Sequence, residues 1–191
     1  GSHARQVTRD GVDAENPTMT ADGEWIVYAS GNDARLGIWK IRPDGADETL
    51  LLAGSALLPE VSPDGRHALC VQYTRLEYVV RVIDLASGEL LDFAIATDPT
   101  QRHLNVVLGR ARWTPDGQAI VYVGQDDQGR TGVYMQDFAA GRDTRATRRQ
   151  VVGFARDFVP ESLGLSPDGR HLAISAMVEN RSLELAEYLD L

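Results

Sequence analysis

The side chains of this sequence best suited to metal binding or nucleophilic catalysis are three histidines, His67, His103 and His171, and one cysteine, Cys70. A metal site needs several ligands that converge on one point. His67 and His171 each stand two residues after the glycine of a repeated motif, so we expect them on different structural units, near the rim. His103 lies in a polar insertion, and Cys70 lies in an apolar run typical of a buried thiol. We therefore predict no metal site and no catalytic cysteine.

Carboxylates also recur at regular spacing, and a cluster of them could act in acid–base chemistry. The recurring pairs are Asp22-Gly23, Asp64-Gly65, Asp116-Gly117 and Asp168-Gly169, whose aspartates are 42, 52 and 52 residues apart. Asp and Gly are the residues that tight turns prefer, since Gly adopts positive φ without strain. We expect one such turn in each of four separate units, which keeps the carboxylates apart.

Other catalytic signatures are absent from the sequence. There is no Gly-x-Ser-x-Gly elbow, no phosphate-binding loop and no His-Glu-x-x-His helix. Asp126 to Arg130 resembles a calcium loop only loosely and lacks its spaced oxygen ligands, so a solvated hairpin is the better interpretation. We predict no catalytic residues and no cofactor.

The elements that carry these turns repeat four times. Segments 19–28, 61–70, 113–122 and 165–174 align without a gap: an apolar residue, Ser or Thr, Pro or Ala, Asp, Gly, two variable positions and an apolar strand. Each predicts a hairpin between two short strands. Third strands are expected at 37–41, 79–84, 132–137 and 183–188, and fourth strands at 49–53, 90–94 and 149–152. This spacing is close to the ~40–50 residues of a propeller blade, so we predict an all-β fold, a β-propeller with four blade repeats.

The predicted domain runs from residue 4 to 191, with blades near 17–54, 59–96, 111–152 and 161–191; residues 1–3 read as the remnant of an expression tag. The last blade lacks a fourth strand, and residues 5–8 resemble 149–152. We expect strand 5–8 to complete the last blade, either within the chain or across a homodimer that forms an eight-bladed ring by strand exchange. The third alternative is that the chain is a piece of a larger propeller.

The composition of the chain limits the classes of partner and of structure that we expect. The chain has 191 residues, 43% of them apolar, and a net charge of −9. An acidic chain is a poor candidate for nucleic-acid binding. A single cysteine excludes an internal disulfide framework. No apolar run approaches ~18 residues, so membrane insertion is not expected.

The four motifs resemble those of the TolB-like, or WD-repeat-like, β-propeller repeats with the Ser-Pro-Asp-Gly signature, over about residues 5–191. The resemblance implies interaction proteins of the periplasm, sensor domains of bacterial kinases and regulators, or gating domains of serine peptidases, with a periplasmic or extracytoplasmic setting favoured. The sequence departs from the pattern in having only four repeats, in Ala21 where the other motifs have Pro, and in lacking an appended kinase, DNA-binding or hydrolase segment.

Recognition is expected on one face, where the connections between second and third strands meet those between blades. The candidate binding residues for a protein or small ligand there are Arg35, Arg75, Arg102, His103, Arg110, Arg130 and Arg156. The aromatic residues on the strand pattern are expected in the core between blades. We predict a non-catalytic binding scaffold, the sensor or interaction propeller of a larger bacterial protein. The alternative is a propeller-type enzyme domain, a polysaccharide lyase or a peptidase-associated propeller.

Overall fold

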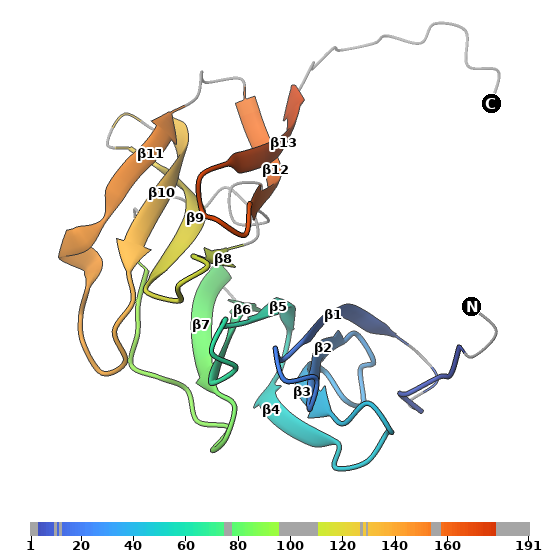
Figure 1. The fold of residues 1–191 in the computed structure, drawn as a ribbon. Coiled ribbons are helices and arrows are strands. Elements are labelled where there is room, and N and C mark those ends of the chain that lie inside the picture. Colours follow the sequence, from blue (N-terminus) through green and yellow to red (C-terminus); the bar gives the residue numbers. More distant parts are fainter. Residues whose placement is uncertain are drawn as a thin grey trace, which may run out of the picture.

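The computed structural model describes residues 4–9, 11, 13–74, 78–95, 111–126, 128, 130–153 and 158–178. Figure 1 shows antiparallel sheets that follow one another around an arc, each formed by one repeat. The strands of the first sheet are β1 (Ala14–Met19), β2 (Ile26–Ser30), β3 (Gly37–Ile41) and β4 (Thr49–Ala53), and those of the second are β5 (Ala56–Val61), β6 (His67–Tyr73) and β7 (Tyr78–Asp84). The predicted all-β class is confirmed.

The third sheet contains β8 (Arg112–Trp113), β9 (Ala119–Gln125), β10 (Thr131–Asp137) and β11 (Arg149–Gly153), with a 3-10 helix at Arg145–Thr147 before its last strand. The fourth sheet contains β12 (Phe158–Leu165) and β13 (Leu172–Val178). We call these four sheets blades 1 to 4. The inner strands β1, β5, β8 and β12 lie nearest the centre of the arc (Figure 1).

The repeated Asp-Gly pairs form the hairpin turns between first and second strands, and one hydrogen-bond pattern holds all four. In blade 2 the Ser62 hydroxyl donates to Asp64 Oδ1 over 2.6 Å and accepts the His67 N–H over 2.9 Å. The same Asp64 oxygen accepts the Arg66 N–H over 3.1 Å. Equivalent bonds form around Thr20, Thr114 and Ser166. Because side chains satisfy the turn's polar groups, the turn is rigid without a larger core.

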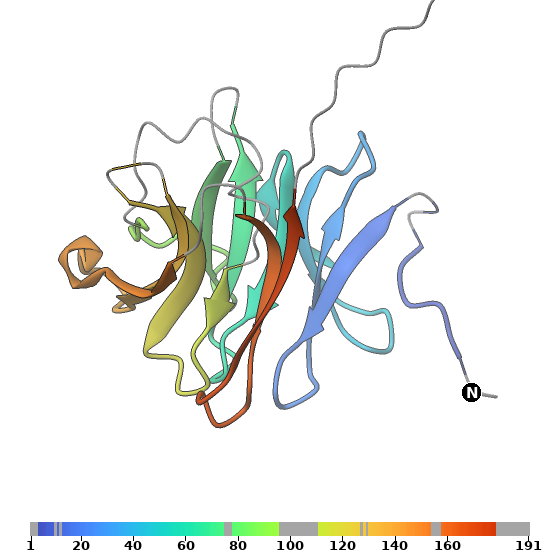
Figure 2. The ribbon, with the colours of Figure 1, turned by 90° about the horizontal axis from the view of Figure 1, so that it is seen from above.

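The turns of all four blades lie on one face of the arc, which we call the turn face (lower edge in Figure 2). The described loops between second and third strands lie on the opposite face, which we call the loop face. The turn face also carries the connections between third and fourth strands, including residues 138–148 between β10 and β11.

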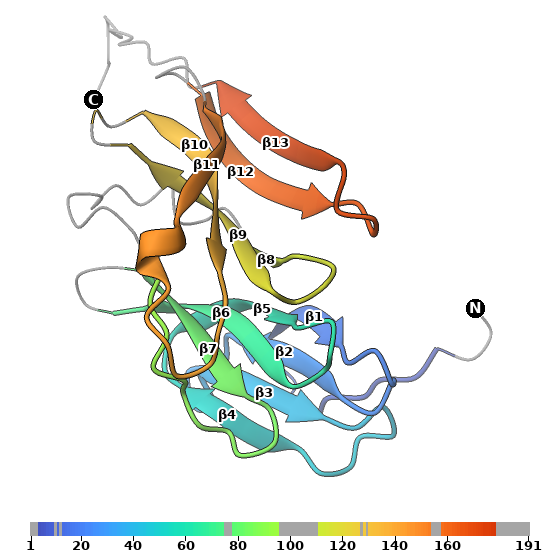
Figure 3. The same cartoon turned by 60° about the vertical axis from the view of Figure 1, so that its left-hand side comes forward.

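Neighbouring blades pack face to face (Figure 3), and we call each such interface a seam. Seam 1–2 buries Val27, Ala29 and Ile38 of blade 1 against Ala68, Cys70 and Ile83 of blade 2. Seam 2–3 centres on Leu69, Trp113, Ile120 and Tyr122, and seam 3–4 on Val121, Val133 and Leu163. Adjacent residues of β6 and β9 serve opposite seams, since strand side chains alternate between faces. This explains why these central strands read as continuous apolar runs.

The aromatic residues expected in the core differ in burial. Tyr28, Tyr122, Tyr134 and Trp113 are 2–5% exposed. Trp25 and Trp39 are only half-buried, and cationic side chains lie over their rings. Lys40 and Arg42 approach the Trp25 ring centroid at 4.6 and 4.7 Å, and Arg35 approaches that of Trp39 at 4.2 Å. Such contacts stabilise an exposed indole by about 0.5–1 kcal/mol each.

The predicted closure by strand 5–8 within the chain is not formed. Residues 4–9 are not part of a strand, and they lie beside blade 1, on the side away from blade 2 (Figures 1 and 3). Arg5 donates to the Pro43 carbonyl over 2.6 Å, and the Val7 carbonyl lies against Gly45. The physical reason is that β12 and β13 stand at the opposite end of the arc, too far from residues 4–9 to pair with them (Figure 1).

Two other expected strands, the fourth of blade 2 and the third of blade 4, are not seen as predicted among the described residues. The fourth strand expected at 90–94 is reduced to a single bridge, between Leu90 and Ile83. Here the backbone turns inward after Leu91, and Phe93 and Ile95 are buried in seam 2–3. The third strand expected at 183–188 lies outside the described residues.

Candidate functional site

Two of the predicted recognition residues lie in the described chain, and each is held by its own blade. Arg35 pairs with Glu48 at 2.7 Å while its guanidinium covers Trp39. Arg130 pairs with Asp126 at 2.7 Å and closes the β9–β10 loop. The other five, Arg75, Arg102, His103, Arg110 and Arg156, lie outside the described residues. The binding role of the loop face stays a prediction.

A pocket of about 570 Å³ lies instead on the turn face, between the inner strands. Its residues come from blades 2, 3 and 4: Glu60, Pro63, Arg112, Trp113, Pro115, Gly164, Leu165, Ser166 and Pro167. The three prolines are the turn prolines of successive blades, so the repeat itself builds the apolar wall. We call this hollow the channel pocket.

Arg112 forms the charged centre of the channel pocket. Its Nη1 donates to Glu60 Oε2 in blade 2, and its Nε donates to the Leu163 carbonyl in blade 4 over 2.9 Å. Glu60 Oε1 also accepts the Trp113 N–H over 3.0 Å, and the Glu60 carbonyl accepts the Trp113 indole N–H over 3.1 Å. Three blades are thus joined through two partly exposed charged side chains. A charge-assisted network of this kind holds its members in fixed geometry.

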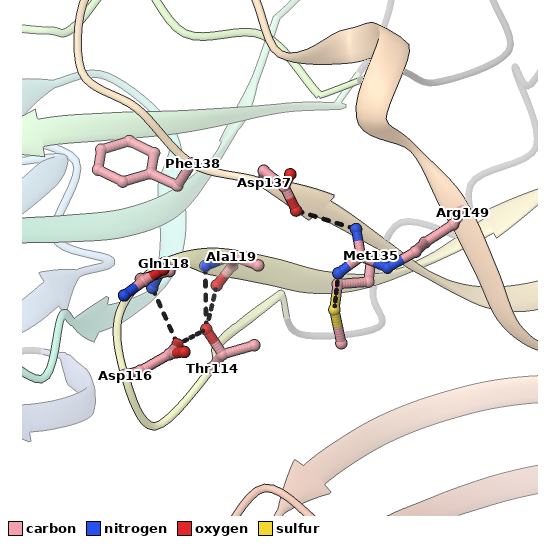
Figure 4. Close-up of a pocket in the computed structure, with 8 residues that line it drawn as sticks. All are labelled: Thr114, Asp116, Gln118, Ala119, Met135, Asp137, Phe138 and Arg149. Atoms are coloured by element: carbon pink, nitrogen blue, oxygen red, sulfur yellow. Dashed lines mark hydrogen bonds and ion pairs between the residues drawn. The ribbon is translucent and has the colours of Figure 1, made fainter.

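A second pocket, of about 490 Å³, lies on the turn-face side of blade 3 (Figure 4). Its charged groups bind one another. Arg149 donates to Asp137 Oδ1 over 2.9 Å and contacts the Met135 sulfur, and Asp116 accepts the Thr114 hydroxyl over 2.6 Å. All the residues that line this pocket belong to blade 3, whereas three blades converge on the channel pocket, which is therefore the stronger candidate for a ligand site.

The histidines and the cysteine occupy unlike environments. The His67 ring is half-buried in seam 2–3, at the turn-face start of β6, with its centroid 5.3 Å from that of Phe138 and 6.4 Å from that of Trp113. His171 is exposed beside Asp168, and His103 lies outside the described residues. Within the described chain, no three His, Cys, Asp or Glu residues are grouped so as to hold a metal ion.

Cys70 is 1% exposed, and burial raises the pKa of its thiol to about 12. Since the thiolate is the reactive form of cysteine, this residue is inert in the folded protein. No helix among the described residues has the length and apolar character needed to cross a membrane.

Sequence reasoning missed Glu60 and Arg112 as site residues. Both occupy the same repeat position, one residue before the apolar residue that precedes the turn. An alignment of the repeats shows opposite charges at the same position of adjacent repeats. To interpret these charges as an ion pair, one must know that this position faces the neighbouring inner strand, and the alternating pattern alone does not reveal that.

Comparisons with known proteins agree with the fold. Over 63 residues the chain is 36% identical to the Tol-Pal system protein TolB of Alcanivorax borkumensis, a match that covers 33% of this chain and 13% of that protein. It is 26% identical over 121 residues to an uncharacterized protein of Agrobacterium fabrum, covering 57% of this chain and 39% of that one. No family model matches.

Solved structures are similar over most of the chain. TolB from Acinetobacter baumannii superposes with a TM-score of 0.63 at 21% identity, over 88% of this chain and 39% of that one. A putative TolB from Agrobacterium tumefaciens gives 0.63 at 13% identity, over 86% and 55%. A prolyl endopeptidase gives 0.60 at 17% identity, over 86% and 26%. The chain thus has a TolB-like β-propeller fold and spans well under two thirds of these relatives.

Proposed function

We propose that this chain is a non-catalytic propeller scaffold that binds a protein partner at the channel pocket. The observation that carries the proposal is the pocket itself: a hollow of about 570 Å³ with a wall of three turn prolines and Leu165. Arg112 stands beside that wall, and Arg is one of the residue types most enriched where proteins bind one another. Similarity to TolB-like propellers supports this class of function.

The geometry favours an extended segment that places one apolar side chain between the prolines. Rigid walls reduce the ordering cost of binding, because the turns and the Glu60–Arg112 network are already fixed. The charged pair lines the pocket with side chains 18–27% exposed, and we expect these exposed parts to hydrogen-bond the main chain of such a segment. The partner class is therefore a peptide or loop with an exposed apolar residue.

Gly164 provides a direct test of this site. A Cβ added there meets no described atom within 4 Å, and the residue is in an extended strand, so Gly164→Phe should fill the pocket without strain. We would select peptides from a displayed random library against the chain and measure their affinity by calorimetry. Gly164→Phe should weaken binding at least tenfold, whereas Arg130→Ala on the loop face should leave it unchanged. Peptides lost with Arg130→Ala and retained by Gly164→Phe would assign recognition to the loop face instead.

We also propose that the scaffold serves a larger bacterial protein as its sensor or interaction part, in keeping with the family resemblance. The native coding sequence tests this: a kinase, DNA-binding or peptidase segment encoded in the same frame would support it. The enzyme alternative is tested separately, with polysaccharide and peptide substrates. Turnover of either substrate class that co-purifies with the chain would contradict a non-catalytic role.

A further inference from the structure

The inner strand of blade 2 contains a backbone outlier. Leu58 has a φ of +56°, in the left-handed region that glycine and asparagine adopt readily but bulky residues rarely do. Pro59 follows it, and a residue before proline is normally extended. Strain of this kind persists only where the surrounding structure imposes it, and it is concentrated at functional sites. A strained residue two positions before Glu60, which lines the channel pocket, therefore points to a role in that pocket.

Leu58 is part of a β-bulge. The pairing of β5 with β6 shifts register between Leu57 and Glu60, so that Leu58 and Pro59 together stand opposite one residue of β6, Cys70. A bulge adds one residue to a strand and changes the direction of the side chains that follow it. Because strand side chains alternate between faces, a regular strand without the added residue would turn Glu60 to the opposite face.

Both flanks of the bulge are held by packing or hydrogen bonds. Before it, Leu57 packs against the buried cluster of seam 1–2, and Pro59 within the bulge is buried. After it, the Glu60 carboxylate accepts a guanidinium N–H of Arg112 and, over 3.0 Å, the main-chain N–H of Trp113. The Glu60 carbonyl accepts the Trp113 indole N–H over 3.1 Å. The strained residue therefore joins seam 1–2 to the residues that line the channel pocket.

Blade 1 contains the same bulge, but with a residue type that tolerates it. Asn16 has a φ of +51° and precedes Pro17, at the same distance from the turn aspartate as Leu58. Asparagine visits the left-handed region routinely. The equivalent of Glu60 in blade 1 is Thr18, and no described residue of blade 1 lines the channel pocket. The bulge is thus common to blades 1 and 2, whereas the glutamate that follows it is particular to blade 2.

We propose that Leu58 is a positioning residue of the channel pocket and acts through Glu60. The left-handed backbone at Leu58 directs Glu60 towards blade 3, where Glu60 holds Arg112 and Trp113 in the arrangement that lines the pocket. This inference rests on the peptide-binding function proposed above. Affinity for peptide should then follow the ease with which residue 58 adopts positive φ, which is the reverse of the order expected from strand preference.

The test compares Leu58→Val with Leu58→Asn. Valine adopts positive φ less readily than leucine but favours strands, whereas asparagine has both preferences reversed. With a peptide selected from the displayed library, Leu58→Val should raise the dissociation constant about tenfold, and Leu58→Asn should keep it within about twofold of the parent value. Calorimetry reports affinity separately from the binding-competent fraction, so partial unfolding lowers only the stoichiometry. Asn16→Val, the matched change in blade 1, should leave the dissociation constant unchanged.

Exchange of the Trp113 indole N–H with solvent, followed by NMR, tests the same inference without any peptide. Leu58→Val should speed this exchange about tenfold, because the hydrogen bond to the Glu60 carbonyl depends on the bulge. Leu58→Asn should slow it, since asparagine relieves the strain. The indole N–H of Trp39, which donates to the Arg35 carbonyl over 2.9 Å, is the internal reference and should be unaffected.

Two results would overturn the inference. One is Leu58→Val with unchanged indole exchange and unchanged peptide affinity. The other is Leu58→Asn that weakens binding and speeds exchange as Leu58→Val does, which would assign the effect to the leucine side chain and not to its backbone conformation. If Leu58→Val does not fold, Leu58→Asn alone decides by the direction of the change in Trp113 exchange. Peptide binding that ignores Gly164→Phe would contradict the proposed function instead, and the exchange measurements would still test the role of Leu58.

Discussion

At the residue scale, the structure depends on a small hydrogen-bonded unit repeated four times. In each turn a hydroxyl donates to the aspartate two residues later and accepts the N–H five residues later. The hydroxyl's hydrogen bond lowers the pKa of Asp22, Asp116 and Asp168. At Asp64 burial raises the pKa, but the Ser62 hydroxyl, the Arg66 N–H and the nearby His67 and Arg66 side chains together outweigh it, and the net direction is again downward. The ionised form of all four turns is therefore favoured by folding.

This predicts a shared acid sensitivity. A carboxylate whose pKa is lower in the folded than in the unfolded state adds stability above the unfolded value, about 3.9, and that stability is lost as pH falls through the folded value. The free energy of unfolding should thus fall below about pH 4. Asp116→Asn and Thr114→Val should each flatten that dependence, and Thr114→Val should cost about 1 kcal/mol at neutral pH. Urea unfolding at a series of pH values checks this; profiles parallel to that of the parent chain would contradict it.

Cys70 gives a second prediction at this scale. Its thiol has a pKa of about 12 and is buried in seam 1–2. A thiol reagent at pH 8 should label the native chain only when blades 1 and 2 separate, so the labelling rate should rise with urea in step with unfolding. Rapid labelling without denaturant would show that seam 1–2 opens easily. Cys70→Ala serves as the blank.

At the scale of elements, the Glu60–Arg112 network replaces apolar packing among the inner strands of blades 2, 3 and 4. Arg112→Met retains the alkyl chain and removes the donors to Glu60 and Leu163. We expect a loss of about 1–3 kcal/mol, because the Glu60 carboxylate and the Leu163 carbonyl lose the hydrogen bonds that Arg112 donates. Urea unfolding measures the loss.

Combining Arg112→Met with Glu60→Gln should cost less than the sum of the two single changes, as expected for residues that share a network. Hydrogen exchange should meanwhile show faster exchange in β12 of Arg112→Met. Additive losses with unchanged β12 exchange would mean that the pair contributes little to joining the blades.

At the scale of the whole molecule, the chain is an array in which each blade contacts only its neighbours. The free energy of unfolding of such an array is approximately the sum of contributions from the individual blades and from the seams between them. The blades therefore need not unfold together. Strands β2, β6 and β9 are each paired on both sides and largely buried, while blade 4 has an exposed outer face. We expect amide exchange to be slowest in β2, β6 and β9 and fastest in β13. Uniform protection across all blades would indicate a single cooperative unit.

The repeat made much of this architecture predictable. Ser-Pro-Asp-Gly fixes a turn locally, so the turns and the flanking strands of each hairpin follow from a few residues. Closure was not predictable in this way: residues 5–8 have the composition of a fourth strand, but nothing in them specifies whose blade they complete. The channel pocket was missed for a similar reason, since Glu60 and Arg112 show their relation only once neighbouring inner strands are placed side by side.

The distribution of tryptophans makes the chain its own optical reporter. Trp25 and Trp39 both lie in blade 1, half-buried under cationic side chains, whereas Trp113 is 4% exposed in seam 2–3. Intrinsic fluorescence therefore divides into an outer signal from one end of the arc and an inner signal from its middle. Iodide should quench the first before the second, and Trp113→Phe should remove the protected fraction alone. Events at the first blade and in the centre can thus be followed separately, without any attached dye.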